Sequence, residues 1–222
     1  ELVNAGADPN DQRNGFTPLH ALSWVRRPNR GDDISGQPPP EGSGRLTSMG
    51  FARQLVKLGA DVNRRLDKRG GRHSMLSLDG ATPFFLFCRT ADLPMMKLLV
   101  ELGADPLLPN KEGATPLMAA AGLGCHAPTE EAGTEAECIE AVQYLLSLKS
   151  NVNAVDKNGE TVMHGAAYKS LPGMVRYLAG HGASIDIWNR KNSKGWTPLL
   201  IAEGFRPGNF KPSEETIAAI HD

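Results

Sequence analysis

Two neighbouring aspartates and a serine between two glycines are the first residues to consider as catalytic candidates. Asp32 and Asp33 place two carboxylates side by side, but sequence neighbours usually point apart, which disfavours a shared acid–base site. Gly42-Ser43-Gly44 falls short of the Gly-x-Ser-x-Gly nucleophile turn. Neither a phosphate-binding Gly-rich loop nor a paired-histidine zinc motif occurs in the sequence. We therefore expect no catalytic, cofactor-binding or metal-binding residues, and a protein that is not an enzyme.

The three cysteines match no metal-ligand spacing. Cys125 and Cys138 flank a loop, and in an oxidising compartment a disulfide between them would staple that loop. In a reducing compartment both stay free thiols, which is the state that we favour. Cys88 follows four apolar residues and is expected to pack in the core.

Charge and hydropathy narrow the class of partner. The chain has 222 residues, with 24 basic and 25 acidic side chains, so its formal net charge is −1. Nucleic acid is bound mainly through clustered Lys and Arg, so we expect no nucleic-acid partner. No stretch reaches the roughly 18 apolar residues of a membrane helix, so no membrane insertion is expected. A cytoplasmic location is expected, with an upstream signal peptide left open.

Two short phrases alternate along the chain. The first is Gly-x-Thr-Pro-apolar, with Val162 replacing the proline in one copy, and its threonines are Thr17, Thr82, Thr115, Thr161 and Thr197. The second is Gly-Ala-Asp-x-Asn and its variants, beginning at Gly6, Gly59, Gly103, Lys149 and Gly182. Alternation of two phrases indicates a repeat protein.

Each phrase has a physical role. A threonine hydroxyl accepts an orphan backbone N–H at a helix start, and a proline at the first helical position loses no hydrogen bond. Small residues after it, such as Ala119 and Gly165, allow helices to approach closely. The glycine of the second phrase suits a helix end with positive φ. Lys149 occupies that place in one copy, at an expected cost of about 1 kcal/mol relative to glycine.

Helix, tight turn, helix and polar hairpin-like loop, in a unit near 33 residues, resemble the ankyrin repeat. Thr82 and Thr115 are 33 residues apart, and Thr161 and Thr197 are 36 apart. The resemblance implies an all-α ankyrin-repeat solenoid that forms a single domain over residues 1–222. It also implies that His20 and His164, which recur at one repeat position, hydrogen-bond the neighbouring loop.

The expected repeat boundaries allow for three insertions. A partial repeat covers residues 1–10 and is followed by units 11–63, 64–107, 108–153, 154–186 and a capping unit 187–222. The insertions span 26–47, 64–78 and 125–137, and the first and third are expected to share one edge. The second is basic, with Arg64, Arg65, Lys68, Arg69 and Arg72. Long loops on a rigid scaffold carry function in some proteins and are tolerated decoration in others.

Two further expectations concern origin and context. Residues 24–29, the Pro-rich tract 38–44 and residues 195–204 resemble ankyrin-repeat proteins of environmental bacteria that have no assigned function. Residues 1–5 read as the end of a second helix without its first, which indicates a fragment of a longer protein. Residues 212–215 begin a final helix with one apolar stripe.

In ankyrin stacks the loops and first helices line a concave face, and the resemblance places a partner there. The residues expected to point outward on it are Arg13, Asn14, Phe16, Trp24, Arg89, Thr90, Lys111, Glu112, Lys157, Asn158, Glu160, Tyr168, Lys169, Lys194 and Trp196. Trp24, Arg89, Tyr168 and Trp196 are the expected anchors, because aromatic and arginine side chains dominate many interfaces. The alternative is that Trp24 packs beneath its adjacent loop and Trp196 against the terminal hairpin beside Trp188.

The expected function is a non-catalytic scaffold that binds another protein through this face. A regulatory or anchoring module of a larger protein, whose catalytic domain lies outside this chain, is the alternative. An enzyme that uses the insertions, or nucleic-acid contact through the basic insertion, ranks below both. A repeat scaffold does not by itself name its partner.

Overall fold

The computed structural model describes residues 3, 5–27, 45–67, 76–128, 130–206 and 211–222. Within these ranges the chain forms eleven helices and no strand. The helices follow one another as α1 (Pro18–Arg26), α2 (Ser48–Lys57), α3 (Pro83–Arg89), α4 (Leu93–Glu101), α5 (Pro116–Ala120), α6 (Glu135–Ser147), α7 (Val162–Tyr168), α8 (Pro172–Gly180), α9 (Ile185–Trp188), α10 (Pro198–Ala202) and α11 (Glu214–His221). The expected all-α solenoid is confirmed.

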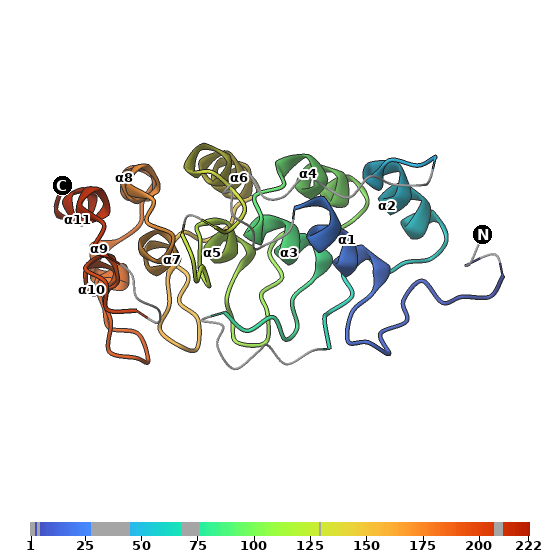
Figure 1. Ribbon diagram of the computed structural model, residues 1–222, viewed down its shortest axis with the longest axis horizontal. Coiled ribbons are helices and arrows are strands. Elements are labelled where there is room, and N and C mark those ends of the chain that lie inside the picture. The colour runs from blue at the N-terminus through green and yellow to red at the C-terminus, as the bar shows by residue number, and fades with distance from the viewer. Residues whose placement is uncertain (1–2, 4, 28–44, 68–75, 129, 207–210) are drawn as a thin grey trace.

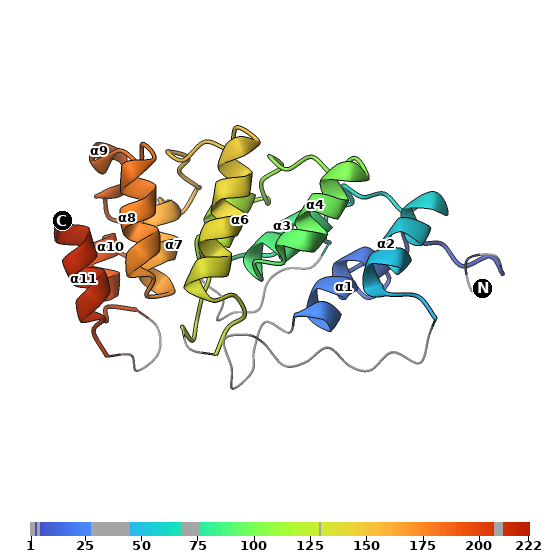
Figure 2. The same cartoon turned by 90° about the horizontal axis from the view of Figure 1, so that it is seen from above.

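The helices form two layers along one axis. Helices α1, α3, α5, α7 and α10 make an inner layer, and α2, α4, α6, α8 and α11 cover it (Figures 1 and 2). The loops between successive pairs extend together to one side of the stack (Figure 1). Each inner helix thus packs between its outer partner and the neighbouring inner helices.

Helix starts follow the repeat phrases. Thr17, Thr82, Thr115, Thr161 and Thr197 are the N-caps of the five inner helices, as the sequence predicts. The last helix is capped by Ser213 and begins at Glu214. Helix α6 begins at Glu135, so residues 135–137 of the expected third insertion are already helical. Most of residues 26–47 and 64–78 lie outside the described ranges.

The core runs the length of the stack and is built from the inner helices. Phe84, Phe85, Phe87 and Cys88 of α3 are fully buried, which confirms the core role expected for Cys88. Close helix packing depends on small side chains. A Cβ at Gly165 in α7 would lie 2.8 Å from the backbone nitrogen of Leu123, at the end of the preceding inner helix.

Lys149 adopts the left-handed conformation that the sequence predicts, with φ of 68°. Its side chain is exposed and ends a helix where the other copies carry glycine. Lys149→Gly is therefore expected to raise the free energy of unfolding by about 0.5–1 kcal/mol, measured by urea denaturation. Gly182→Ala is the mirror control, because Gly182 has φ of 89° and open space around a Cβ. Gly182→Ala should lower the free energy of unfolding by a similar amount. An unchanged free energy of unfolding for Lys149→Gly would show that the left-handed backbone at Lys149 is not strained.

Candidate interaction surface

Asparagine side chains tie successive hairpin-like loops together. Asn10 Nδ2 donates to the Gly59 carbonyl, and Asn10 Oδ1 accepts from the Asp61 N–H, at 2.8 and 2.7 Å. Asn63 makes the same pair of bonds to Gly103 and Asp105. Asn153 repeats them with Gly182 and Ser184. Sequence reasoning missed this ladder, although its signal is the asparagine that ends the second phrase.

Buried histidines brace the same edge. His20 Nε2 donates to the carbonyl of Ala81 and His164 Nε2 to that of Trp196, both at 3.3 Å, while each Nδ1 accepts from the threonine cap. These bonds confirm the expected loop contact. Burial lowers the pKa of both imidazoles to about 4, so both are neutral near pH 7.

Five of the expected partner-facing residues are exposed at the loop tips: Arg13, Asn14, Lys111, Lys157 and Lys194. Six more are half-buried: Phe16, Trp24, Arg89, Glu112, Asn158 and Trp196. Phe16 and Trp24 pack edge to face, with ring centroids 5.1 Å apart, so Trp24 lies against its adjacent loop. Lys194 Nζ lies 5.8 Å from the centre of the Trp196 ring.

The remaining four expected residues are buried: Thr90, Glu160, Tyr168 and Lys169. The expectation that they point outward is wrong, because other parts of the chain cover them. The Arg206 guanidinium lies 5.5 Å from the Tyr168 ring centre and donates to the Tyr168 carbonyl. Lys169 Nζ donates to the carbonyl of Ala132 and to Cys138 Sγ. Tyr168 is thus no candidate anchor in this conformation.

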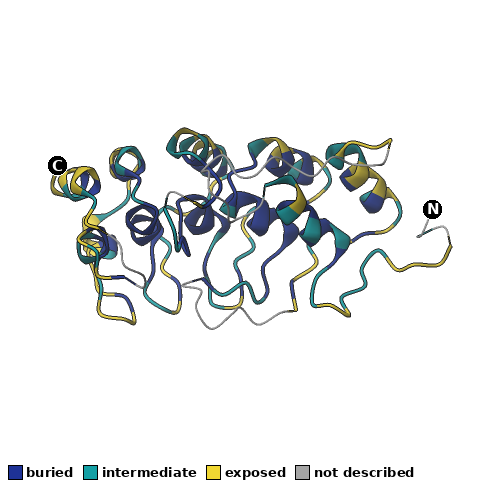
Figure 3. Ribbon diagram, in the orientation of Figure 1, coloured by how far each residue is buried: buried dark blue, intermediate teal, exposed yellow. Residues whose placement is uncertain are grey.

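The inner face is closed over its central helices. Every residue of α5 and α7, and every residue of α3 except Arg89, is buried (Figure 3). Leu76 packs so tightly on Gly124 that a Cβ there would lie 2.3 Å from its own Cβ. Arg89 Nη2 lies 3.7 Å from Oε2 of Glu131, a residue that is only 4% exposed. The exposed members of the expected surface therefore lie on the loops rather than on these helices.

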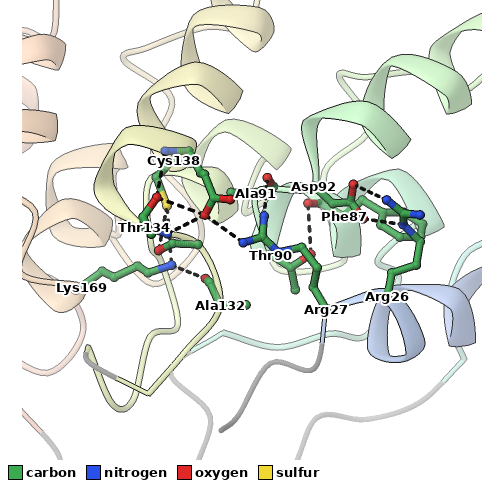
Figure 4. A network of polar contacts seen from close by, with 12 residues as sticks. Arg26, Arg27, Phe87, Thr90, Ala91, Asp92, Ala132, Thr134, Cys138 and Lys169 are labelled. Atoms are coloured by element: carbon green, nitrogen blue, oxygen red, sulfur yellow. Dashed lines mark hydrogen bonds and ion pairs between the residues drawn. The ribbon is translucent and has the colours of Figure 1, made fainter. Parts of the chain in front are cut away.

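A polar network joins the ends of the first and third insertions (Figure 4). Arg27 donates to the Ala91 carbonyl at 3.0 Å and to Glu137 Oε2 at 2.8 Å. Glu137 in turn accepts from the backbone N–H of Thr134. The Arg27 guanidinium, largely through its hydrogen bond, helps to hold the pKa of Glu137 below its ordinary value against the opposing effect of burial. Arg27 and Glu137 thus join the described ends of the two insertions, and residues 28–44 lie outside the described ranges, so the expected shared edge stays a prediction.

Cys88, Cys125 and Cys138 are buried free thiols. Burial raises the pKa of Cys125 to about 12 and that of Cys138 above its ordinary value. In the described ranges no three His, Cys, Asp or Glu side chains gather closely enough to hold a metal ion. None of the described helices has the length and apolar character needed to cross a membrane. Of the basic insertion, Arg64 and Arg65 are exposed, and Lys68, Arg69 and Arg72 lie outside the described ranges.

Stacked helix pairs with loops on one edge, braced by threonine–histidine pairs, define a helical-repeat solenoid. A model of three ankyrin repeats matches residues 132–209, and a model of one ankyrin repeat matches residues 79–111, together half of the chain. The chain belongs to the ankyrin-repeat family. This membership points to a protein–protein interaction module.

Several proteins of known name are similar to the chain. A probable 26S proteasome regulatory subunit p28 of Saccharomyces cerevisiae is 31% identical over 56% of this chain and 50% of its own length. Human ankyrin repeat and SOCS box protein 6 is 34% identical over 75% of this chain and 34% of its own. A putative palmitoyltransferase ZDHHC13 of Danio rerio is 27% identical over 91% of this chain and 30% of its own length. The chain thus spans at most half of these relatives, which are eukaryotic, and the bacterial resemblance stays an expectation.

Proposed function

We propose that this chain is a non-catalytic module that binds a partner protein through the edge formed by its hairpin-like loops. The observation that carries the proposal is the set of exposed side chains at equivalent tips: Arg13, Lys111, Lys157 and Lys194. The asparagine ladder and the histidine bonds hold these loops in place. A preorganised edge loses little conformational freedom on binding.

Two half-buried aromatic groups give this edge its anchors. The Phe16–Trp24 pair lies at one end of the stack, and Trp196 with Lys194 lies at the other. Tryptophan and arginine carry much of the energy of protein interfaces, so these ends and Arg13 are the proposed contact points. Asn14, Glu112 and Asn158 complete the proposed surface, whereas Arg89 lies at the end of α3 beside Glu131 and is not part of the loop edge.

Charge reversal of the loop tips tests the proposal. Arg13, Lys111, Lys157 and Lys194 are all changed to Glu, and photo-crosslinked partners are compared by quantitative mass spectrometry. The matched control reverses four exposed cations on the outer helices: Arg53, Lys57, Lys97 and Arg176. Each set breaks two ion pairs of exposed cations, and such surface pairs contribute little to stability.

We expect that a partner protein crosslinks to both the wild type and the control variant. The recovery of this partner should fall at least about tenfold with the loop variant. Circular dichroism confirms that both variants keep their helices. Equal recovery with the loop variant would rule out the loop edge as the binding site.

A second proposal is that the chain regulates or anchors a larger protein. It is favoured by the similarity to the putative palmitoyltransferase of Danio rerio, of which the aligned segment is 30%. The reading frame on either side of these residues tests it. A catalytic domain in the same frame would support the proposal, and a frame without one would oppose it.

A further inference from the structure

Glu160 is a buried carboxyl between the last two hairpin-like loops. It lies just before α7 and is 2% exposed. Its Oε1 accepts from the Tyr168 hydroxyl at 3.2 Å and from Asn192 Nδ2 at 2.9 Å. Its Oε2 is buried and has no hydrogen-bond partner among the described residues. An ionised carboxylate here would therefore carry charge on an oxygen that nothing solvates.

Asn192 makes this carboxyl part of the terminal loop. Its Nδ2 also donates to the Tyr168 hydroxyl, at 3.1 Å. Its Oδ1 accepts from the backbone N–H groups of Lys194 and Trp196, both at 3.0 Å. The Asn192 side chain thus orders the last loop while its amide group contacts Glu160. Whatever disturbs the Glu160 contact disturbs the loop that carries Lys194 and Trp196.

The groups around Glu160 do not neutralise it. Asp156, from the same loop, is 8% exposed and adds like charge, and Glu112 of the preceding loop lies near Asp156. Lys194 is exposed and only partly offsets them. Two further titratable groups pack nearby: Arg206, over the Tyr168 ring, and His164, which is uncharged near neutral pH.

We propose that the Glu160 carboxyl is a proton-operated latch between the fourth hairpin-like loop, which carries Asp156 and Glu160, and the terminal loop, which carries Asn192 and Trp196. The neutral carboxyl stays buried against Tyr168 and Asn192. The carboxylate draws water to Oε2, and the Asn192 contact opens. Residues 189–196 then separate from the fourth loop. This latch does not depend on which partner the loop edge binds.

The sign of the pH dependence follows from burial. Burial, and then the charge of Asp156, raise the pKa of Glu160 to about 7 from an ordinary value of 4.5, and they outweigh the hydrogen bonds from Tyr168 and Asn192, which favour the carboxylate. The folded chain therefore binds this proton more tightly than the unfolded chain does, so its stabilising effect is full at low pH and falls away as pH rises from 4.5 through about 7. The pKa values of His20 and His164 are lower in the folded chain than in the unfolded chain. These two histidines therefore destabilise the folded chain as pH falls below about 6.5. The decline between pH 4.5 and about 7 thus reports on Glu160, and comparison of two proteins at equal pH cancels the contribution of the histidines.

Hydrogen exchange of the terminal loop tests the latch with Glu160→Gln, which keeps a neutral group of the same shape. At pH 8 the amides of residues 189–196 should exchange at least about tenfold more slowly in Glu160→Gln than in the wild type. The difference should become small as pH falls toward 4.5, where the carboxyl is largely protonated in the closed loop and increasingly so in the open one. Comparison at equal pH cancels the intrinsic pH dependence of exchange. Glu112→Gln is the matched control and should behave as the wild type throughout this range.

Equal protection of wild type and Glu160→Gln at pH 8 would overturn the latch. A second measurement does not depend on any variant: the carboxyl carbon of Glu160 is titrated in the wild type by NMR. A midpoint well above that of exposed glutamates supports the proposal, and a midpoint in the ordinary range refutes it.

Discussion

Asp92→Ala is expected to lower the free energy of unfolding by about 3–5 kcal/mol, because it breaks a largely buried ion pair. Asp92 is 2% exposed, and its carboxylate accepts from Arg26 Nε at 2.6 Å and from Arg26 Nη2 at 3.0 Å. The same side chain caps α4 by accepting from the Met95 N–H. Its loss therefore leaves the Arg26 guanidinium without its carboxylate and α4 without its cap.

Two further variants separate these contributions in urea denaturation. Asp92→Ser keeps a capping oxygen and loses the ion pair, so it should recover about 1 kcal/mol relative to Asp92→Ala. Arg26→Met combined with Asp92→Ala removes the stranded charge and should recover a further part of the loss. A loss below about 1 kcal/mol for Asp92→Ala would contradict the importance of the pair.

Gly165→Ala is expected to destabilise the chain by about 2–3 kcal/mol, although alanine usually favours a helix interior by about 1 kcal/mol over glycine. The reason is the close approach of α7 to the end of the preceding inner helix. A Cβ at Gly165 would lie 2.8 Å from the Leu123 nitrogen and 3.2 Å from the Met118 carbonyl oxygen. Both are backbone atoms, so neither can rotate away.

Gly180→Ala is the control for this reversal of sign. Gly180 also lies in a helix, α8, but nothing stands within 4 Å of the place that a Cβ would take there, so alanine should be neutral or stabilising. Thermal unfolding measures both variants. A raised melting temperature for Gly165→Ala would show that the two helices can separate without cost.

The positions of helix starts and turns could be predicted because their causes are local. A threonine caps the helix that follows it within three residues, so the role of Thr82 could be predicted from the sequence. A left-handed turn depends on one residue, so the conformation of Lys149 could be predicted as well. The hydrogen bonds of His20 and His164 could also be predicted, because both histidines make the same contact to the next loop. Repetition turns a long-range contact into a local pattern.

Exposure of the expected partner face could not be predicted in the same way. Tyr168 and Lys169 occupy repeat positions that usually point outward, and here Arg206 and Ala132 cover them from 38 and 37 residues away. The segments that supply these contacts have no periodicity, so nothing in the repeat indicates where they fold back. Glu160 is buried by a contact of another kind, because Asn192 of the next hairpin-like loop donates to its carboxyl group.

The sequence by itself thus determined the repeat, the helix pairs, their caps and the bracing histidines, since each follows from neighbouring residues or from a recurring phrase. Only the tertiary structure decided which side chains of that repeat remain exposed. Exposure depends on every segment that packs over a residue, and here those segments are the insertions and the terminal loop. The loop tips at Arg13, Lys111, Lys157 and Lys194 are exposed, and α3, α5 and α7 are closed.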